Sequence, residues 1–302
     1  LAVFGGQPLD YDAAAMAAVW QADEEQALDL RLALVDAGLV ETAQASGGTR
    51  YALHQVIAAF ADARLALDPG EKRATALRHA QHYGGVWGGY DKALSAGLMT
   101  YDAPLEWENG AVALERLAAW SASDDEAAAI LLDYARSWRN VLTNNYDPRR
   151  MGWLEAAVAA AQRVGDPRDQ ATTLQAIGDV QNFRKDMDAA LASYRQALDL
   201  FRSVGSRLGE ANTLLAQGDI LRSQHSFAPA WEHYTQVAAL YAAIGDRYSL
   251  ARVLYRMGDW HAAQEQRQPA AELYRQAIDL WRSIGVDDLV DSILLPRLRA
   301  VT

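Results

Sequence analysis

The chain has 302 residues, no cysteine and a formal net charge of -11, because 39 Asp and Glu outnumber 28 Lys and Arg. Its composition, 51% hydrophobic and 22% charged, is typical of a folded globular protein and excludes wholesale disorder. The absence of cysteine excludes disulfides, thiol nucleophiles and thiolate metal sites. The acidic balance argues against nonspecific binding to nucleic acids, and no apolar run approaches the roughly 20 residues of a membrane span. We therefore expect a cytoplasmic protein that makes no membrane contact.

Residues 1–67 predict a small domain of helices around one β-hairpin. Apolar periodicity predicts helices over residues 10–22 and 24–37, and a further helix after the hairpin at residues 38–53. Asp23 is the predicted N-cap of the second helix. The apolar stripe of that helix consists of Leu28, Leu32 and Val35. The order helix, helix, β-wing, helix is that of a winged helix.

A winged helix that reads DNA needs a basic recognition surface. Residues 1–67 contain three arginines against nine carboxylates, a net charge of -6. DNA binding is therefore the less favoured function of this domain.

Three segments of this domain resemble the winged helix of the NB-ARC, or STAND-type, signal-transduction ATPases: residues 1–4, 34–40 and 50–54. The resemblance implies that a nucleotide-binding domain, which binds ADP or ATP, lies upstream in a longer parent protein. It also implies that His54 senses the ADP phosphate, since the family's Met-His-Asp motif falls where the wing meets the last helix. Here the motif reads Leu53-His54-Gln55. A helix-capping role is the alternative for His54.

Residues 68–125 are interpreted as a helical connector or degenerate first repeats, which the same family resemblance also suggests. Helices are predicted over residues 69–97 and 103–120, with a linker at residues 121–125. The pairs Gly84-Gly85 and Gly88-Gly89 indicate either a break or tight packing. His79 and His82 lie one helical turn apart, but no third ligand is apparent, so we expect no metal site.

The second half of the chain is an internal repeat with a period of 40 residues. Nine positions are identical in three copies, and in the first copy they are Gly165, Ala171, Leu174, Gly178, Asp179, Ala190, Tyr194, Gln196 and Leu200. Each copy predicts two helices, with an αL glycine and an N-cap between copies. A degenerate copy precedes them, and residues 287–300 predict a helix that covers the last repeat.

This repeat resembles the tetratricopeptide repeat, through its Gly178 and its Ala190-x3-Tyr194 spacing, although the period is longer than the family's 34 residues. We predict an all-α protein: a winged-helix domain with a short β-wing, followed by a tetratricopeptide-like α-solenoid over residues 126–302. In such a solenoid the first helix of each pair lines the concave face. The resemblance then implies a partner-binding groove lined by Gln175, Asp179, Asn182, Leu215, Asp219, Arg222, Arg252, Tyr255 and Asp259.

The repeated aspartates would give this groove negative stripes, tempered by Arg222 and Arg252, and Tyr255 would be its aromatic anchor. The alternative is that the aspartates bind partners within the repeats. The chain has no P-loop, no nucleophile elbow and no zinc-protease motif, so it predicts neither an enzyme nor a cofactor of its own. The favoured function is the sensor region of a STAND-type ATPase that binds a protein or peptide. A free-standing scaffold and a DNA-binding regulator are the alternatives.

Overall fold

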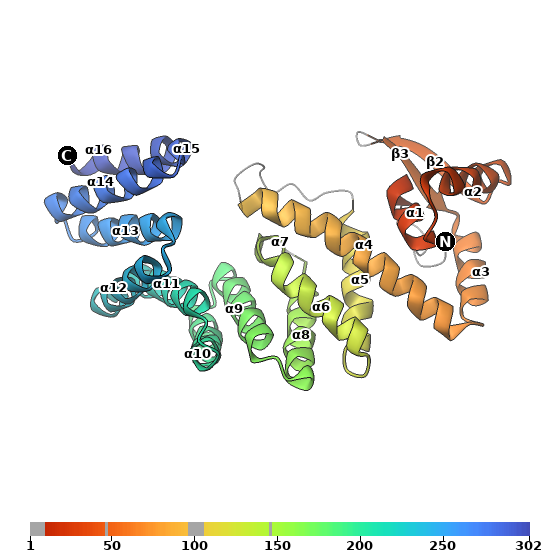
Figure 1. Cartoon of the computed structure of the whole chain (residues 1–302), viewed down its shortest axis with the longest axis horizontal. Coiled ribbons are helices and arrows are strands. Elements are labelled where there is room, and N and C mark those ends of the chain that lie inside the picture. Colours follow the sequence, from red (N-terminus) through yellow and green to blue (C-terminus); the bar gives the residue numbers. More distant parts are fainter. Residues whose placement is uncertain (1–9, 46–47, 96–105, 145–146) are drawn as a thin grey trace. The chain divides into compact units, whose positions relative to one another are not determined.

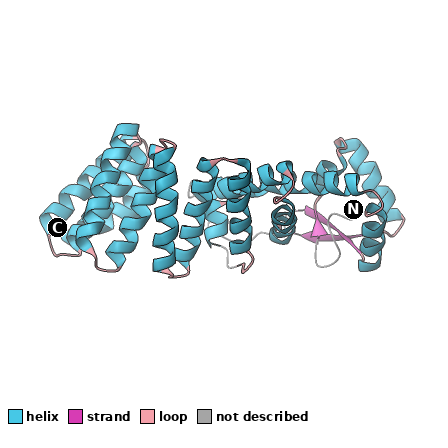
Figure 2. Cartoon of the chain, turned by 90° about the horizontal axis from the view of Figure 1, so that it is seen from below, coloured by secondary structure: helices cyan, strands magenta, loops and turns pink. Residues whose placement is uncertain are grey.

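The computed structural model describes residues 10–45, 48–95, 106–144 and 147–302 (Figure 1). The chain forms two compact units, Leu1–Gly165 and Asp166–Thr302. Helices make up most of the described residues, and the strands found among them all lie in the first unit (Figure 2). The prediction of an all-α protein with a short β-hairpin near its start is confirmed. Residues 1–4, part of the segment that suggested the ATPase resemblance, lie outside the described residues.

The first unit begins with three helices and a small antiparallel sheet. The elements are β1 (Asp10–Tyr11), α1 (Ala13–Trp20), α2 (Glu24–Asp36), β2 (Val40–Ala45), β3 (Gly48–Leu53) and α3 (Gln55–Leu65). The strand order is β1-β3-β2, with Asp10 opposite Ala52 and Val40 opposite Leu53. The prediction of a helix from residue 10 is therefore wrong at its start, because Asp10 and Tyr11 add a strand to the hairpin. The helix begins after Asp12, whose carboxylate accepts a hydrogen bond from the Ala15 amide at 2.7 Å.

Helices α2 and α3 leave most of their apolar residues in solvent. Leu28 and Leu32 of α2 are 44% and 52% exposed, and Val56 and Phe60 of α3 are 67% and 66% exposed. Each helix has a single buried residue, Ala27 in α2 and Ala58 in α3. The predicted apolar stripe of α2 exists, but the described residues cover it only in part.

The rest of the first unit is helical: α4 (Pro69–Ser95), α5 (Trp107–Trp120), α6 (Asp125–Ser137), α7 (Arg139–Asn144) and α8 (Arg150–Val164). Helix α4 runs unbroken through both glycine pairs. A Cβ atom on Gly84 would lie 2.8 Å from Cε2 of Tyr134 in α6, and one on Gly88 would lie 3.5 Å from Cβ of Ser137. Gly84 therefore serves tight packing of α4 on α6, whereas Gly85 and Gly89 meet nothing within 4 Å. The alternative of a helix break is wrong, because α4 continues through both pairs.

The second unit consists of three helical hairpins and a C-terminal segment. Its elements are α9 (Pro167–Phe183), α10 (Met187–Ser203), α11 (Arg207–Ser223), α12 (Phe227–Ile244), α13 (Arg247–Ala262), α14 (Arg267–Ser283), α15 (Asp287–Leu289), η2 (Val290–Leu294) and α16 (Leu295–Val301). The predicted start and stop signals are confirmed. Gly205 and Gly245 have φ of +65° and +79°, and the Asp166 and Asp246 side chains cap α9 and α13.

The glycine in the middle of each first helix makes room for a tyrosine of the second helix. A Cβ atom on Gly178 would lie 2.5 Å from Cε1 of Tyr194, and the same atoms would be 2.8 Å apart at Gly218 and Tyr234. These distances are too short for any side chain larger than hydrogen, so the repeated glycine is required by the packing of each hairpin.

The C-terminal segment covers the last hairpin, as predicted. Val290 and Leu294 are buried in one cluster with Tyr274 and Trp281. Between residues 290 and 294 the helix widens to a π-helical turn, and it then continues beyond Pro296 to Val301. Proline does not end the helix here, because it falls in the first turn of α16, where its missing amide hydrogen is tolerated.

The adjacent glycines of α4 offer a matched test of this packing. We expect Gly84→Ala to lower the free energy of unfolding by about 1–3 kcal/mol, because the added methyl would press on the buried ring of Tyr134. Gly85→Ala meets nothing within 4 Å and should instead raise it by about 0.5–1 kcal/mol through helix propensity. Urea unfolding of both variants measures the difference, and equal effects would contradict the close contact.

Candidate partner-binding site

The repeated aspartates hold the two helices of each hairpin together. The hydroxyl groups of Tyr194, Tyr234 and Tyr274 donate hydrogen bonds to the carboxylates of Asp179, Asp219 and Asp259 at 2.7, 2.8 and 2.8 Å. Burial raises the pKa of the Tyr234 and Tyr274 hydroxyls, so they stay protonated and act as donors. This geometry corresponds to the alternative in which the aspartates bind partners within the repeats.

Two of the aspartates also bind an arginine from a following helix. Arg256 Nη1 of α13 lies 3.3 Å from Asp219 Oδ2, and Arg297 Nε of α16 lies 3.0 Å from Asp259 Oδ1. A 40-residue step from Arg256 leads to Pro296 and not to Arg297. The π-helical turn η2 accounts for the extra residue, since such turns commonly accommodate one inserted residue.

Asp219 lies among three arginines. Burial raises the pKa of its carboxyl group, and Arg256, the Tyr234 hydroxyl, Arg222 and Arg252 each act in the opposite direction. Asp219 is already bound by Tyr234 and Arg256. The Nε atoms of Arg222 and Arg256 are buried without a hydrogen-bond partner among the described residues. Arg222 and Arg252 therefore act on this carboxylate without forming an ion pair with it among the described residues.

Tyr255, the predicted anchor, lies mostly inside the second unit. It is 9% exposed, and its ring meets that of Trp281 edge-on at a centroid distance of 5.7 Å. The guanidinium carbons of Arg256 and Arg297 each lie 5.4 Å from its ring centroid. The Tyr255 ring thus packs against the guanidinium groups of both arginines. Direct contact of Tyr255 with a ligand stays a prediction.

The other residues predicted to line the groove differ in accessibility. Gln175 and Leu215 are buried, and Leu215 belongs to the core cluster around Tyr234 and Val237. Asn182, Arg222 and Arg252 are half-buried. These three are the predicted residues, apart from the aspartates, with side-chain surface left for a partner.

Sequence reasoning missed Arg256 and Arg297. The signal for Arg256 was its departure from the repeat, since Ala176 and Ala216 stand at the equivalent positions of the first two copies. The signal for Arg297 was hidden, because the extra residue of the π-helical turn moves it out of the 40-residue register.

His54 is exposed and is the N-cap of α3. Its Nδ1 accepts a hydrogen bond from the Val56 amide at 3.3 Å, so the capping geometry is present. The proposed contact with a nucleotide phosphate stays a prediction. Among the described residues no group of three His, Asp or Glu side chains could hold a metal ion. Burial lowers the pKa of His79 to about 3, which keeps its imidazole neutral.

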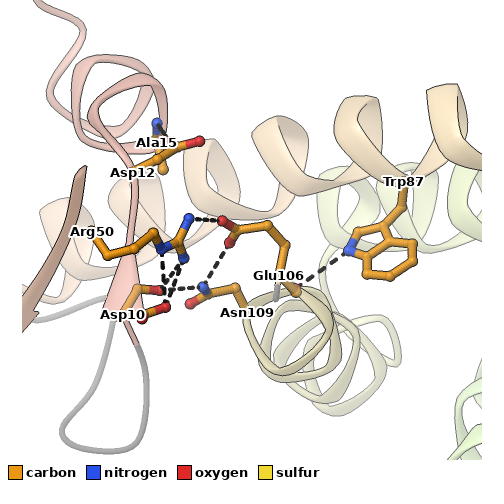
Figure 3. A network of polar contacts seen from close by, with 7 residues as sticks. All are labelled: Asp10, Asp12, Ala15, Arg50, Trp87, Glu106 and Asn109. Carbon is orange, nitrogen blue, oxygen red and sulfur yellow. Dashed lines mark hydrogen bonds and ion pairs between the residues drawn. The ribbon is translucent and has the colours of Figure 1, made fainter. Parts of the chain in front are cut away.

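A second polar cluster lies in the first unit, around the buried Arg50 of β3 (Figure 3). Its guanidinium donates to the Asp10 carboxylate at 2.7 Å and to the Asp10 carbonyl at 3.0 Å, and it pairs with the Glu106 carboxylate. Asn109 donates to the Asp10 carbonyl and to Glu106 at 2.7 and 3.0 Å, and Trp87 Nε1 donates to the Glu106 carbonyl. The cluster joins the small sheet to the start of α5. Sequence reasoning missed it, because Glu106 lies 56 residues from Arg50.

Comparison with known proteins supports the repeat assignment. Residues 169–243 and 209–283 match the family model described as tetratricopeptide repeat. No curated protein sequence matches the chain. The crystal structure of BtubC (BKLC) from P. vanneervenii is similar over 62% of this chain and 82% of that one, with a TM-score of 0.52 and 17% identity.

A second crystal structure is of a signal transduction ATPase with numerous domains (STAND) from Pyrococcus horikoshii, which carries a tetratricopeptide repeat sensor. The match covers 90% of this chain and 48% of that one, with a TM-score of 0.44 and 13% identity. No helix in the described ranges is long and apolar enough to cross a membrane. Residues 169–283 are tetratricopeptide repeats, a fold that mediates protein–protein interaction.

The tyrosine–aspartate bond can be tested in the middle hairpin. We expect Tyr234→Phe to lower the free energy of unfolding by about 1.5–3 kcal/mol, because the charged, half-buried carboxylate of Asp219 loses the hydrogen bond that the Tyr234 hydroxyl donates. Tyr248→Phe, at a residue 36% exposed, is the control and should change it by less than about 0.5 kcal/mol. Urea unfolding measures the free energy of unfolding of both variants. Equal decreases would mean that the hydrogen bond of the Tyr234 hydroxyl does not stabilise the hairpin.

Proposed function

We propose that the chain is the non-catalytic recognition and relay region of a STAND-type ATPase. The tetratricopeptide hairpins bind a protein or peptide, and the elements β1 to α3 form a winged helix that relays this event to an upstream nucleotide-binding domain. ADP or ATP is bound by that domain and not by this chain. The observation that carries the relay is the buried ion cluster of Arg50, Asp10 and Glu106.

This cluster supports a relay because it resists separation of its parts. Arg50 is 6% exposed, and a buried ion pair that loses one partner leaves an uncompensated charge in a medium of low polarity. Strands β1 and β3 are therefore expected to move together with the start of α5. His54 follows β3 directly in the chain, so a movement of α5 would also displace the N-terminus of α3.

The exposed apolar residues of α2 and α3 support a further contact of this part of the molecule. Val56 and Phe60 lie one helical turn apart on α3, whose N-cap is His54, and both are about two thirds exposed. Apolar side chains exposed to this degree commonly mark surfaces where another domain binds. The proposed occupant is the nucleotide-binding domain of the same parent protein, which would bring a nucleotide phosphate near His54.

The charge of the winged helix disfavours the DNA-binding alternative. Arg50 is buried in ion pairs, and Arg31 lies over the ring of Tyr51 at 5.7 Å. Arg64 is the one remaining arginine of residues 10–67, which contain no lysine. A free-standing scaffold is the alternative function that remains if the experiments below contradict the relay.

The sensor role of His54 is tested in the full-length product of the gene. We expect His54→Ala to release bound ADP at least about tenfold faster, because a hydrogen bond to a charged phosphate is lost. The dissociation rate can be followed with a fluorescent ADP analogue. His225→Ala, which removes another exposed histidine, is the control and should leave the rate unchanged. An unaltered rate in His54→Ala would contradict the sensor role.

The mechanical coupling is tested on this chain alone. We expect Arg50→Ala to lower the free energy of unfolding by about 3–5 kcal/mol, since Asp10 and Glu106 are left without their cation. Amide hydrogen exchange should increase in both β3 and the first turn of α5. Arg64→Ala, at an exposed position, should change neither quantity. Faster exchange confined to β3 would contradict the coupling of the sheet to α5.

A further inference from the structure

Three arginines on the first helices of the second and third repeats break the repeat pattern. Arg222 of α11 stands where the other copies have Asn182 and Ala262. Arg252 and Arg256 of α13 also have no charged counterpart at the equivalent positions of the two earlier copies. The residues at those positions are Thr172 and Asn212 for Arg252, and Ala176 and Ala216 for Arg256. Residues needed for packing recur in every copy, so Arg222 and Arg252 are not required by the packing of the hairpins. Arg256 also pairs with Asp219.

Of these three arginines, Arg256 alone forms an ion pair among the described residues. Arg256 shares Asp219 with the Tyr234 hydroxyl. Neither Arg222 nor Arg252 makes an ion pair in the part of the chain that the structure describes. Arg222 and Arg256 each keep a buried Nε–H without an acceptor among those residues. A buried donor without a partner is costly, and an incoming acceptor would remove that cost.

Two of the repeated aspartates are paired with arginine within the second unit. All three repeated aspartates accept tyrosine hydroxyls inside the hairpins, and Asp219 is also paired with Arg256. Asp259 is in addition paired with Arg297. The charge that remains available on α11 and α13 is therefore that of the arginines, although the chain as a whole has a net charge of -11.

We propose that Arg222, Arg252 and Arg256 bind the carboxylate side chains of an acidic segment in a protein partner. This proposal rests on the partner-binding role proposed above for the repeats. Guanidinium groups bind carboxylates through two parallel hydrogen bonds, which favours arginine over lysine at such a site. The three arginines come from two successive first helices, so they present separate positive groups to a chain that carries several carboxylates.

The proposal is tested with the whole 302-residue chain and a fluorescein-labelled hexaglutamate peptide. The fluorescence polarisation of the peptide is measured at about 50 mM and about 300 mM salt. The higher salt concentration weakens contacts between exposed charges. We expect hexaglutamate to bind and hexaglutamine and hexalysine to bind far more weakly. The double variant Arg222→Gln/Arg252→Gln should weaken hexaglutamate binding at least about tenfold. These substitutions leave the Arg256–Asp219 pair in place.

The control is Arg275→Gln/Arg282→Gln, which removes the same charge from exposed positions of α14. Binding that falls equally in both double variants would overturn the site, as would a failure of hexaglutamate to bind the wild-type chain. Competition by inorganic phosphate at the same concentration of charge would also overturn it, because it would indicate a site for a free anion. The measurement needs no nucleotide, so its failure leaves the relay proposal intact. Unchanged ADP release in His54→Ala would likewise leave the arginine site standing.

Discussion

The second unit depends on one arrangement, the contact of a glycine and its neighbouring aspartate with a tyrosine of the next helix. The glycine leaves the space in which the tyrosine ring lies, and the aspartate that follows it accepts the tyrosine hydroxyl. The tyrosine needs both the space beside the glycine and the acceptor that the aspartate provides. An alanine would push the ring away from the helix, and a hydroxyl without the carboxylate would be a buried donor lacking a partner. This explains why the pair Gly-Asp recurs as a unit in all three hairpins.

The same arrangement creates a need for positive charge. A carboxylate placed beside a buried tyrosine is removed from water, and burial raises the pKa of Asp219 accordingly. Arg256 and Arg297 from the following helices meet this need at the second and third hairpins. The π-helical turn η2 allows the last helix to bring an arginine to Asp259, because it shifts the register by one residue. The C-terminal segment thus takes the place of the first helix of a further repeat.

The helices of the repeats could be predicted from the sequence, because the signals that define them are local and occur three times. Helix boundaries, αL glycines and N-caps follow from residues close together in the chain, and the copies support one another. The tyrosine–aspartate bond spans 15 residues and was only one of two readings of the repeated aspartate. The Arg50 cluster joins residues 56 apart that occur once, so neither period nor spacing could have indicated it. The exposure of Phe60 could not be predicted either, because an apolar helix face does not say what covers it.

Charged residues that recur in every repeat differ in their partners from charged residues that break the repeat. A repeated charged residue must satisfy the same neighbours in every copy, so its partner is found within the repeat. Asp179, Asp219 and Asp259 conform to this, since each accepts its own tyrosine. A charged residue that occurs in one copy need not have a partner in every repeat. It pairs within the second unit in some cases, as Arg256 does with Asp219, and it forms no ion pair among the described residues in others. Arg222 and Arg252 are of this second kind, and for that reason the nonrepeated positions are the ones from which the chemistry of a partner can be inferred.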